Sequence, residues 1–406
     1  MAPGDATNFV ASPRMAAGWA MTQLPRSAEV VIIGGGLIGL SSAYYLARAG
    51  CRDVVLLERK WLGSGTSAHC SGGIRAQFST EINIRLSQES LKTFENFEAE
   101  FDVDPEFRRT GYLFLATTPD EEGLFRRNVE LQQRFKVPVE LIGPEVAKRI
   151  VPPLNVEDVR VAAYSASDGI ADPHSVLQAF ARASRRLGVK ILEETEVMSI
   201  GRHSQRVESV VTTVGDIAPG ILVVAAGPWS GQLGKMLDVE IPVYPQRRQA
   251  FMSGPVAGFP PVMPLTIDFN WGFSIRREGP GILMHLGNRK DPPAFVDSPD
   301  WEFFWSCSER IAQRVPALAE AEIVKAYACA YEMTPDVHPI ISRVKDTENV
   351  LVAAGFSGHG FMHSPVAGQL VADLVMKGGT DLLDIRPLRL DRFKEGDLHR
   401  EAAFIG

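Results

Sequence analysis

Three glycines near the start of the chain have the spacing that phosphate binding requires. Gly34, Gly36 and Gly39 occupy the G-x-G-x-x-G positions directly after the apolar run at residues 30–33. The first glycine permits a tight strand-to-helix turn, the second lets a pyrophosphate approach the backbone, and the third lets the helix pack on the strand. The helix that follows offers unpaired N–H groups and a positive dipole end to the phosphates. This stretch predicts a dinucleotide site.

An acidic residue stands where the ribose of a dinucleotide needs it. Residues 54–57 form a second apolar run that ends in Glu58, 24 residues after Gly34. In dinucleotide-binding folds a carboxylate at this strand end bonds the ribose hydroxyls. The alternative is a glycine-rich turn in another kind of α/β protein, with Glu58 exposed to solvent.

A loop of small residues at 59–79 follows, and it can run close to a dinucleotide because it has little side-chain bulk. The stretch from residue 30 to residue 75 resembles the opening of the FAD-dependent amine oxidoreductases of the D-amino acid oxidase and sarcosine oxidase family. Monomeric sarcosine oxidases and the β subunits of proline and opine dehydrogenases resemble it most. The resemblance implies that this loop contacts the flavin and that Arg75 binds the substrate carboxylate, for which a guanidinium is a natural partner. An exposed loop arginine is the alternative.

Two later stretches extend the resemblance. Residues 221–230, ILVVAAGPWS, predict a buried strand that ends in small residues, and the same run recurs in the resembling family. It favours FAD over NAD. Residues 349–378 predict a strand, a glycine-rich turn with the sequence A-G-F-S-G-H-G-F and a helix from about Ser364. N–H groups at such a helix start stabilise the negative charge of a reduced flavin.

The sequence T-P-D at residues 334–336 predicts a turn. Together with Cys329 and Tyr331, which precede it, this turn matches a sequence pattern of the family. In monomeric sarcosine oxidase and its relatives this pattern carries the cysteine that bonds the flavin, which here is Cys329. Tyr331 matches a tyrosine of the substrate pocket. A small buried thiol is the alternative for Cys329, and His69 is a rival attachment site because some dimethylglycine-oxidising relatives use a histidine in that loop.

Two family lysines are missing from this chain. Sarcosine oxidases place a lysine over the flavin for oxygen activation, but the matching segment around His285 has none, which puts oxidase activity in doubt and leaves amine oxidation intact. Relatives also place a lysine near the substrate carboxylate where this chain has Met362 followed by His363. His285 and Met362 join Arg75 and Tyr331 as candidate catalytic residues, although a histidine at such a position is more often structural.

The remaining expected contacts are with the cofactor. They are Gly34, Gly36, Leu37, Ile38, Gly39, Glu58, Arg59, Ser67, His69, Gly73, Val197, Ala226, Gly227, Trp229, Cys329, Gly355, Gly358, His359, Gly360 and Phe361.

Composition narrows the class of protein. A net charge of -7 argues against nucleic-acid binding, and no apolar run approaches the length of a membrane span. The four cysteines lack metal-ligand spacing and suit a reducing compartment, so we expect a soluble cytoplasmic protein without a metal. Residues 1–28 lack the apolar core of a secretory signal and are expected to form a flexible arm.

We expect an α/β fold with a Rossmann-like FAD-binding domain and an inserted, mostly antiparallel β-sheet substrate domain. The FAD-binding domain is assigned to residues 29–105, 151–243 and 325–395, the substrate domain to 106–150 and 244–324, and a tail to 396–406.

The expected reaction is oxidation of the C–N bond of an amino acid or secondary (N-methyl) amine by hydride transfer to flavin N5, giving an imine that hydrolyses. The alternatives are the catalytic β subunit of a heteromeric amine or proline dehydrogenase that passes electrons to a partner, a NAD-dependent dehydrogenase, and a flavin-binding assembly protein without turnover. The sequence leaves open the amine, the electron acceptor and the oligomeric state.

Overall fold

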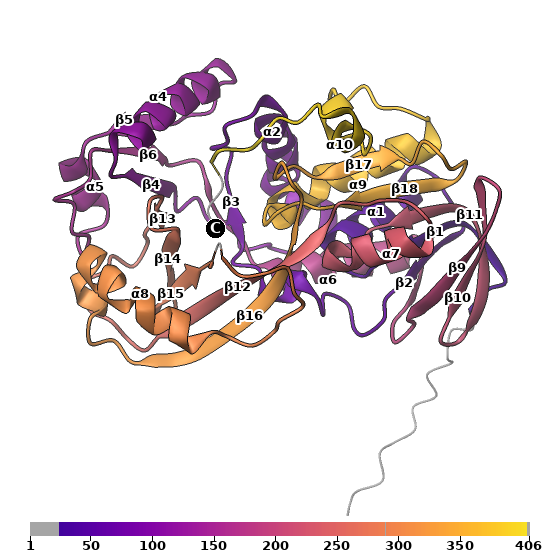
Figure 1. Ribbon diagram of the computed structural model, residues 1–406, viewed down its shortest axis with the longest axis horizontal. Helices are drawn as coiled ribbons and strands as arrows, with labels where there is room; N and C mark the ends of the chain where they lie inside the picture. The colour runs from indigo at the N-terminus through magenta and orange to yellow at the C-terminus, as the bar shows by residue number, and fades with distance from the viewer. Residues whose placement is uncertain (1–23, 289, 404–406) are drawn as a thin grey trace, which may run out of the picture.

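The computed structural model of the chain describes residues 24–288 and 290–403. In this part of the chain the strands form two eight-stranded sheets and one two-stranded sheet. The two large sheets belong to two lobes that lie side by side (Figure 1).

The first sheet is largely parallel. Its main path contains β1 (Ser27–Ile33), β2 (Val54–Leu57), β8 (Lys190–Leu192), β11 (Gly215–Val224), β17 (Ile340–Arg343) and β18 (Val350–Ala354). The order is β17–β18–β11–β1–β2–β8, and the antiparallel strands β9 (Val197–His203) and β10 (Arg206–Thr212) extend from β11. Because β1 lies between the parallel strands β2 and β11, their carboxyl ends meet beside the glycine-rich turn.

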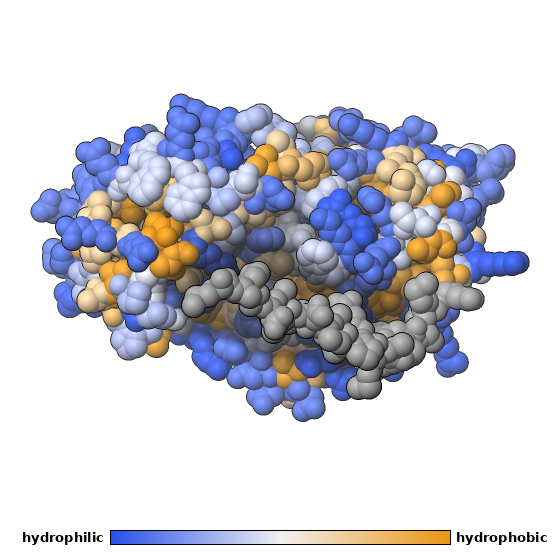
Figure 2. Space-filling view, turned by 90° about the horizontal axis from the view of Figure 1, so that it is seen from below, coloured by the Kyte–Doolittle hydropathy of each residue, from blue (hydrophilic) through white to orange (hydrophobic). Residues whose placement is uncertain are grey.

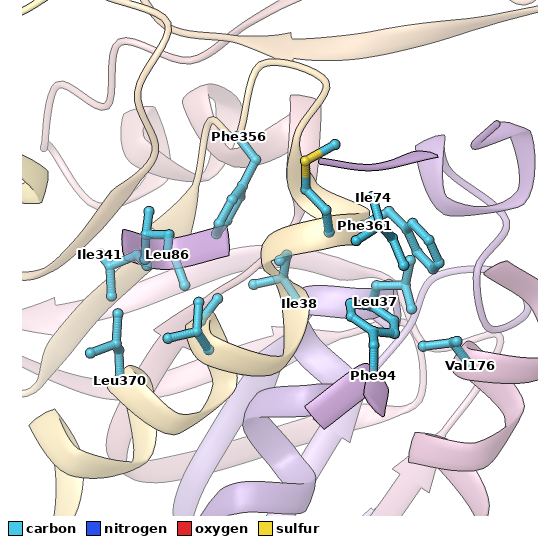
Figure 3. Packing of buried hydrophobic residues seen from close by; sticks show 14 of the residues in the cluster. Leu37, Ile38, Ile74, Leu86, Phe94, Val176, Ile341, Phe356, Phe361 and Leu370 are labelled. Carbon is cyan, nitrogen blue, oxygen red and sulfur yellow. The ribbon is translucent and has the colours of Figure 1, made fainter. Parts of the chain in front are cut away.

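Helices cover the first sheet because its central strands are apolar on both faces. The four residues 30–33 of β1 are all buried, as expected for a strand inside a parallel sheet. On one face lie α1 (Leu37–Arg48), α2 (Glu81–Glu95), α6 (Pro173–Arg186) and α9 (Gly360–Met376). Figure 3 shows Leu37 and Ile38 of α1 among Phe94 of α2 and Phe361 of α9. The short helix α7 (Ser230–Met236) packs on the other face through Leu233.

The second sheet is antiparallel except where β13 pairs with β4. Its strands are β4 (Tyr112–Ala116), β5 (Glu140–Ile142), β6 (Val161–Ser165), β12 (Tyr244–Ser253), β13 (Leu265–Asp268), β14 (Phe273–Glu278), β15 (Gly281–Leu286) and β16 (Ile323–Met333). They are ordered β16–β12–β15–β14–β13–β4–β6–β5. Helix α8 (Trp301–Arg314) packs on the outer face through Phe304 and Ile311.

The opposite, inner face of the second sheet is turned toward the first lobe. The backbone of Gly73 lies against the Tyr112 hydroxyl of β4, and Gly358 lies against the Tyr331 ring of β16. Strands β3 (Gly73–Ile74) and β7 (Gly169–Ile170) form the two-stranded sheet near this junction. The space between the lobes is therefore bounded by side chains of a sheet and by glycine-rich turns.

The remaining elements connect the lobes or cover their edges. They are helices α3 (Phe97–Phe101), α4 (Pro119–Arg134), α5 (Pro144–Ile150) and α10 (Arg392–Glu395), and the 3-10 turns η1 (Thr66–His69), η2 (Gly227–Trp229), η3 (Pro316–Leu318) and η4 (Arg386–Leu388). A capping box of Thr118 and Glu121 begins α4, which satisfies two N–H groups at the helix start.

The expected fold class is confirmed. Two strands, however, belong to a different sheet from the one that the expected domain ranges assigned to them. Strands β6 and β16 belong to the second sheet, although 151–243 and 325–395 were assigned to the FAD-binding domain. Strand pairing decides this, since β16 pairs with β12 along its length. The helix expected from about Ser364 begins at Gly360 and contains Pro365 within its first turns.

The expected arm at residues 1–28 lies outside the described residues up to residue 23, and Ser27 and Ala28 already belong to β1. Of the expected tail, 396–403 are described, and Glu401 is buried.

No helix in the described ranges is long and apolar enough to cross a membrane. The face in Figure 2 is mostly hydrophilic, with apolar residues in separate groups.

A buried ion pair fastens the T-P-D turn to the end of the chain. Both Arg392 and Asp336 are at most 2% exposed, and the guanidinium bonds the two carboxylate oxygens at 2.7 and 3.0 Å. Burial by itself would raise the pKa of Asp336, but the hydrogen bonds and charge of Arg392 outweigh it and hold that pKa below its ordinary value.

We expect Arg392→Met to lower the free energy of unfolding by about 3–5 kcal/mol, because it leaves the Asp336 carboxylate buried without its partner. Urea unfolding measures the change. Arg386→Met is the matched control, since its ion pair with Asp384 is exposed and worth about 0–1 kcal/mol. Equal losses in the two variants would contradict the prediction.

Candidate active site

The turn between β1 and α1 is closed so tightly that side chains do not fit. Gly34 has φ +116°, and a Cβ there would lie 2.3 Å from the carbonyl oxygen of Ala225. A Cβ at Gly39 would lie 1.9 Å from the carbonyl oxygen of Gly34. Only hydrogen atoms are tolerated at this spacing. The turn therefore presents bare backbone at the start of α1, where a phosphate group fits.

Glu58 is buried beside this turn and holds it in place. One carboxylate oxygen accepts the N–H of Gly35 at 2.8 Å, and the other accepts the N–H of Lys60 at 2.9 Å and the Ser64 hydroxyl at 3.3 Å. Ser67 Oγ accepts the N–H of Leu37 at 3.1 Å. The small-residue loop is thus fastened against the start of α1.

A first cavity begins at this turn and collects most of the expected cofactor contacts. The expected residues that line it are Gly34, Gly36, Leu37, Ile38, Glu58, Arg59, Ser67, Val197, Ala226, Gly227 and Trp229. They come from four separated stretches of the chain. The parallel order β11–β1–β2 brings three of these together, and Val197 comes from the start of β9. The guanidinium of Arg59 lies 3.8 Å from the centre of the Trp229 ring, which stacks on Phe295 with ring centres 5.0 Å apart.

Five expected cofactor residues do not line either cavity. Gly39 packs α1 on the turn, and Gly355, with φ +77°, leaves room for the Thr334 methyl group. Gly360 is the first residue of α9. His69 and Cys329 lie near each other, since the His69 ring is 5.7 Å from that of Tyr327, two residues before Cys329 on β16.

A second cavity lies between the inner face of the second sheet and the start of α9. The expected residues that line it are Gly73, Arg75, His285, Tyr331, Gly358, His359, Phe361 and Met362. The two cavities adjoin at β16, because Tyr331 lines the second and the next residue, Glu332, lines the first. Successive side chains of a strand point to opposite sides, so one strand serves both cavities.

Arg75 is buried and bonded largely to the protein itself. Its guanidinium donates to the carbonyl oxygens of Gln77 and, at 3.1 Å, Ala403, lies 3.2 Å from His359 Nε2, and rests 3.9 Å from the Phe78 ring centre. Burial lowers the pKa of Arg75, and the charge of Glu401 opposes that shift. The Glu401 carboxylate is fixed by bonds from Ser79, Thr80 and Asn83.

The imidazoles of the second cavity are neutral. Burial, reinforced by the charge of Arg276, lowers the pKa of His285 to about 3. Its Nε2 makes no hydrogen bond with the described part of the chain. Burial and Arg75 likewise hold the pKa of His359 well below its ordinary value. Neutral imidazole can donate or accept a hydrogen bond but does not repel a cation.

Burial raises the pKa of the Cys329 thiol to about 12. Its neighbour Ala330 accepts a bond from the Thr66 hydroxyl at 2.7 Å, which ties the loop to β16. Cys70 lines the second cavity, whereas Cys329 does not.

Two charged site residues went unnoticed in the sequence. Glu332 lines the first cavity and accepts the Gly355 N–H at 2.8 Å. Burial raises its pKa to about 7. Arg248 of β12 lines the second cavity. The position of Glu332 between Tyr331 and the T-P-D turn was a signal that could have identified it, but only strand pairing brings Arg248 to the site.

The glycine-rich turn, the strand-end glutamate and the small-residue loop of the parallel sheet all line one cavity. This arrangement defines a dinucleotide-binding protein, here with an appended antiparallel domain. Residues 29–374 match the family described as FAD dependent oxidoreductase, and the chain belongs to that family. The cofactor is therefore FAD. The first cavity fits it, because its backbone cradle would be filled by any Cβ at Gly34.

Three of the similar proteins are named for an amine or amino acid that they act on. The chain is 30% identical to the human mitochondrial dimethylglycine dehydrogenase over 92% of this chain and 46% of that protein, so it spans about half the length of this relative. It is 30% identical to sarcosine oxidase subunit beta of Arthrobacter sp, with 94% of each covered. The crystal structure of L-proline dehydrogenase from P. horikoshii matches with a TM-score of 0.86 at 35% identity, covering 93% of this chain and 100% of that one.

We expect Glu332→Gln to stabilise the flavin-free protein above pH 7 by at most about 3 kcal/mol. The folded protein raises the pKa of Glu332 from 4.5 to about 7. Ionisation of Glu332 therefore lowers the free energy of unfolding by an amount that grows as the pH rises from 4.5 to about 7 and stays constant above that pH. The glutamine amide oxygen can still accept the Gly355 N–H.

Urea unfolding at several pH values measures this difference, which should vanish near pH 4.5. Exposed Glu320→Gln is the control and should leave the pH profile unchanged. A Glu332→Gln protein that is less stable than the parent at pH 8 would refute the expected effect.

Proposed function

We propose that the chain catalyses FAD-dependent oxidation of the C–N bond of an amino acid or a secondary (N-methyl) amine. The observation that carries the proposal is the second cavity, which adjoins the FAD cavity at β16 and is lined by two arginines, two neutral histidines and two tyrosines. Such a lining suits an amine that carries a carboxylate. The three named relatives support it, since sarcosine, dimethylglycine and proline are all amino acids with a substituted nitrogen.

The protein's own part in the reaction is positioning. FAD supplies the two-electron oxidation of the amine carbon. His285 and Tyr331 lie on the inner face of the second sheet, and Met362 adds an apolar contact at the start of α9. The two arginines that line the cavity disfavour a cationic amine, so the cavity favours a neutral amine, whose lone pair assists loss of hydride from the adjacent carbon. Water then hydrolyses the imine product.

The electron acceptor and any partner subunit belong to the proposal as alternatives. The likeness to a sarcosine oxidase subunit beta, whose length the chain matches, favours a catalytic subunit that works with a partner. The absence of a lysine in the segment around His285 favours an acceptor other than oxygen. An assembly protein that binds FAD without turnover is the remaining alternative.

Anaerobic addition of sarcosine, dimethylglycine or L-proline to the purified holoprotein should bleach the flavin absorbance near 450 nm. Trimethylglycine is the matched control, because its quaternary nitrogen has no lone pair, and it should leave the flavin oxidised. If no amino acid or amine bleaches the flavin, the assembly-protein alternative is favoured. Peroxide formed in air at the rate of turnover would identify oxygen as the acceptor and argue against the partner subunit.

We also propose that Cys329 bonds the flavin through a thioether. The thiol would lose its proton, the 8α methyl group would lose one hydrogen as a proton, and the sulfur would join the 8α carbon. The electron pair of the broken C–H bond would pass to the flavin ring, which the electron acceptor of the enzyme would then reoxidise. Because burial raises the pKa of this thiol to about 12, the bond requires bound FAD to promote the thiolate.

Acid precipitation should leave the yellow colour in the pellet of the parent protein and release it to the supernatant from Cys329→Ser. His69→Ala should keep the colour in the pellet. Colour released from the parent protein would show that Cys329 serves only in packing, and colour lost from the pellet only in His69→Ala would assign the bond to His69.

A further inference from the structure

Arg248 lies on the inner face of the second sheet, one strand in from its edge. It lies on β12, between β16 and β15, and is 8% exposed. Its cross-strand partner on β16 is Cys329, and its guanidinium carbon lies 5.5 Å from the centre of the Tyr331 ring. The side chain therefore reaches the wall that the second cavity shares with the expected flavin contacts.

Gly287, directly after β15, makes room for this side chain. A Cβ at Gly287 would lie 3.0 to 3.1 Å from the Nε, Cδ and Cζ atoms of Arg248. A side chain at this position would require Arg248 to shift by a few tenths of an ångström. The missing side chain of Gly287 therefore leaves the space that Arg248 occupies beside the cavity.

The charged side chains that line the second cavity in the described part of the chain are of one sign. Among the described residues that line it, Arg75 and Arg248 are cationic and none is acidic. The charge of Arg75 is partly offset by Glu401, and its guanidinium already bonds the carbonyl oxygens of Gln77 and Ala403. The Arg248 guanidinium donates to the carbonyl oxygen of Arg247 at 2.9 Å and to the side-chain oxygen of Gln246 at 3.3 Å.

We propose that Arg248 binds the carboxylate of the substrate, with Gly287 providing its clearance, and that the substrate is an amine bearing a carboxylate. This rests on the proposed function in taking an amine as substrate. A carboxylate is a stronger acceptor for a guanidinium than an amide or carbonyl oxygen, and it can accept two parallel N–H bonds. Its binding also places a negative charge in a cavity whose lining holds only positive ones.

The position of Arg248 also orients the substrate. His285 pairs with Ala250, two residues along β12 on the same side of the sheet, and Tyr331 lies beside the guanidinium. A carboxylate held at Arg248 therefore leaves the amine end near the His285 Nε2 and the Tyr331 hydroxyl. Arg75 then acts in shaping the loop and the start of α9 through His359.

Acetate binding tests this assignment without turnover. Acetate should perturb the visible spectrum of the oxidised holoprotein, and its dissociation constant should rise at least about tenfold in Arg248→Met, because a hydrogen-bonded charge pair is lost. Arg248→Lys keeps the charge but cannot donate two parallel N–H bonds, so its dissociation constant for acetate should lie between those of the parent and Arg248→Met. Gly287→Ala, which crowds the guanidinium, should also weaken acetate binding.

Arg277→Met is the matched control, because Arg277 lies on β14 of the same sheet but does not line the cavity. This variant should bind acetate as the parent protein does. Flavin content and melting temperature establish that each variant is folded. With a carboxylated amine as substrate, Arg248→Met should raise KM more than it lowers kcat.

The assignment is overturned if Arg248→Met, or Arg248→Lys where the former does not fold, binds acetate within twofold of the parent. Acetate that leaves the parent spectrum unchanged, or a tenfold loss in Arg75→Met alone, would overturn it as well. Acetate binding that depends on Arg248 in a protein whose flavin no amine bleaches would instead refute the proposed function and leave the anion site standing.

Discussion

The contact between the turn after β1 and the end of β11 is the constraint on which the rest of the structure depends. Gly34 and Ala225 are so close that no side chain fits between them. This closeness follows from the parallel pairing of β1 with β11, which brings two carboxyl ends to one edge. With bare backbone there, the dinucleotide can reach the start of α1, and every other contact of the first cavity is arranged around it.

Strand β16 connects that edge to the second lobe. It pairs with β12 in the second sheet, and two of its successive residues line different cavities. Tyr331 therefore faces the substrate side, whereas Glu332 faces the cofactor side. The T-P-D turn that follows is fixed by the buried pair of Asp336 and Arg392. The end of the chain thus holds the strand on which both cavities meet.

The two cavities differ in the charged groups that line them. The lining of the cofactor side contains three carboxyl groups: Glu58 bonded to backbone N–H groups, Glu196, and Glu332 with a pKa raised by burial. The lining of the substrate side contains arginines and neutral imidazoles in the described part of the chain. An anionic substrate and the ribose hydroxyls of the cofactor are therefore each matched by a lining of suitable chemistry.

The sequence alone determined the features that depend on local chain geometry. The glycine spacing, the acid at residue 58 and the apolar runs specified the cradle, because a tight turn and a buried strand each require particular residue types within a few positions. The match of Cys329 and Tyr331 to a known pattern likewise needed no coordinates. Only the tertiary structure decided that β6 and β16 join the second sheet, that Arg75 bonds the chain itself, and that Arg248 reaches the cavity. These depend on strand pairing between distant segments, which local periodicity does not encode.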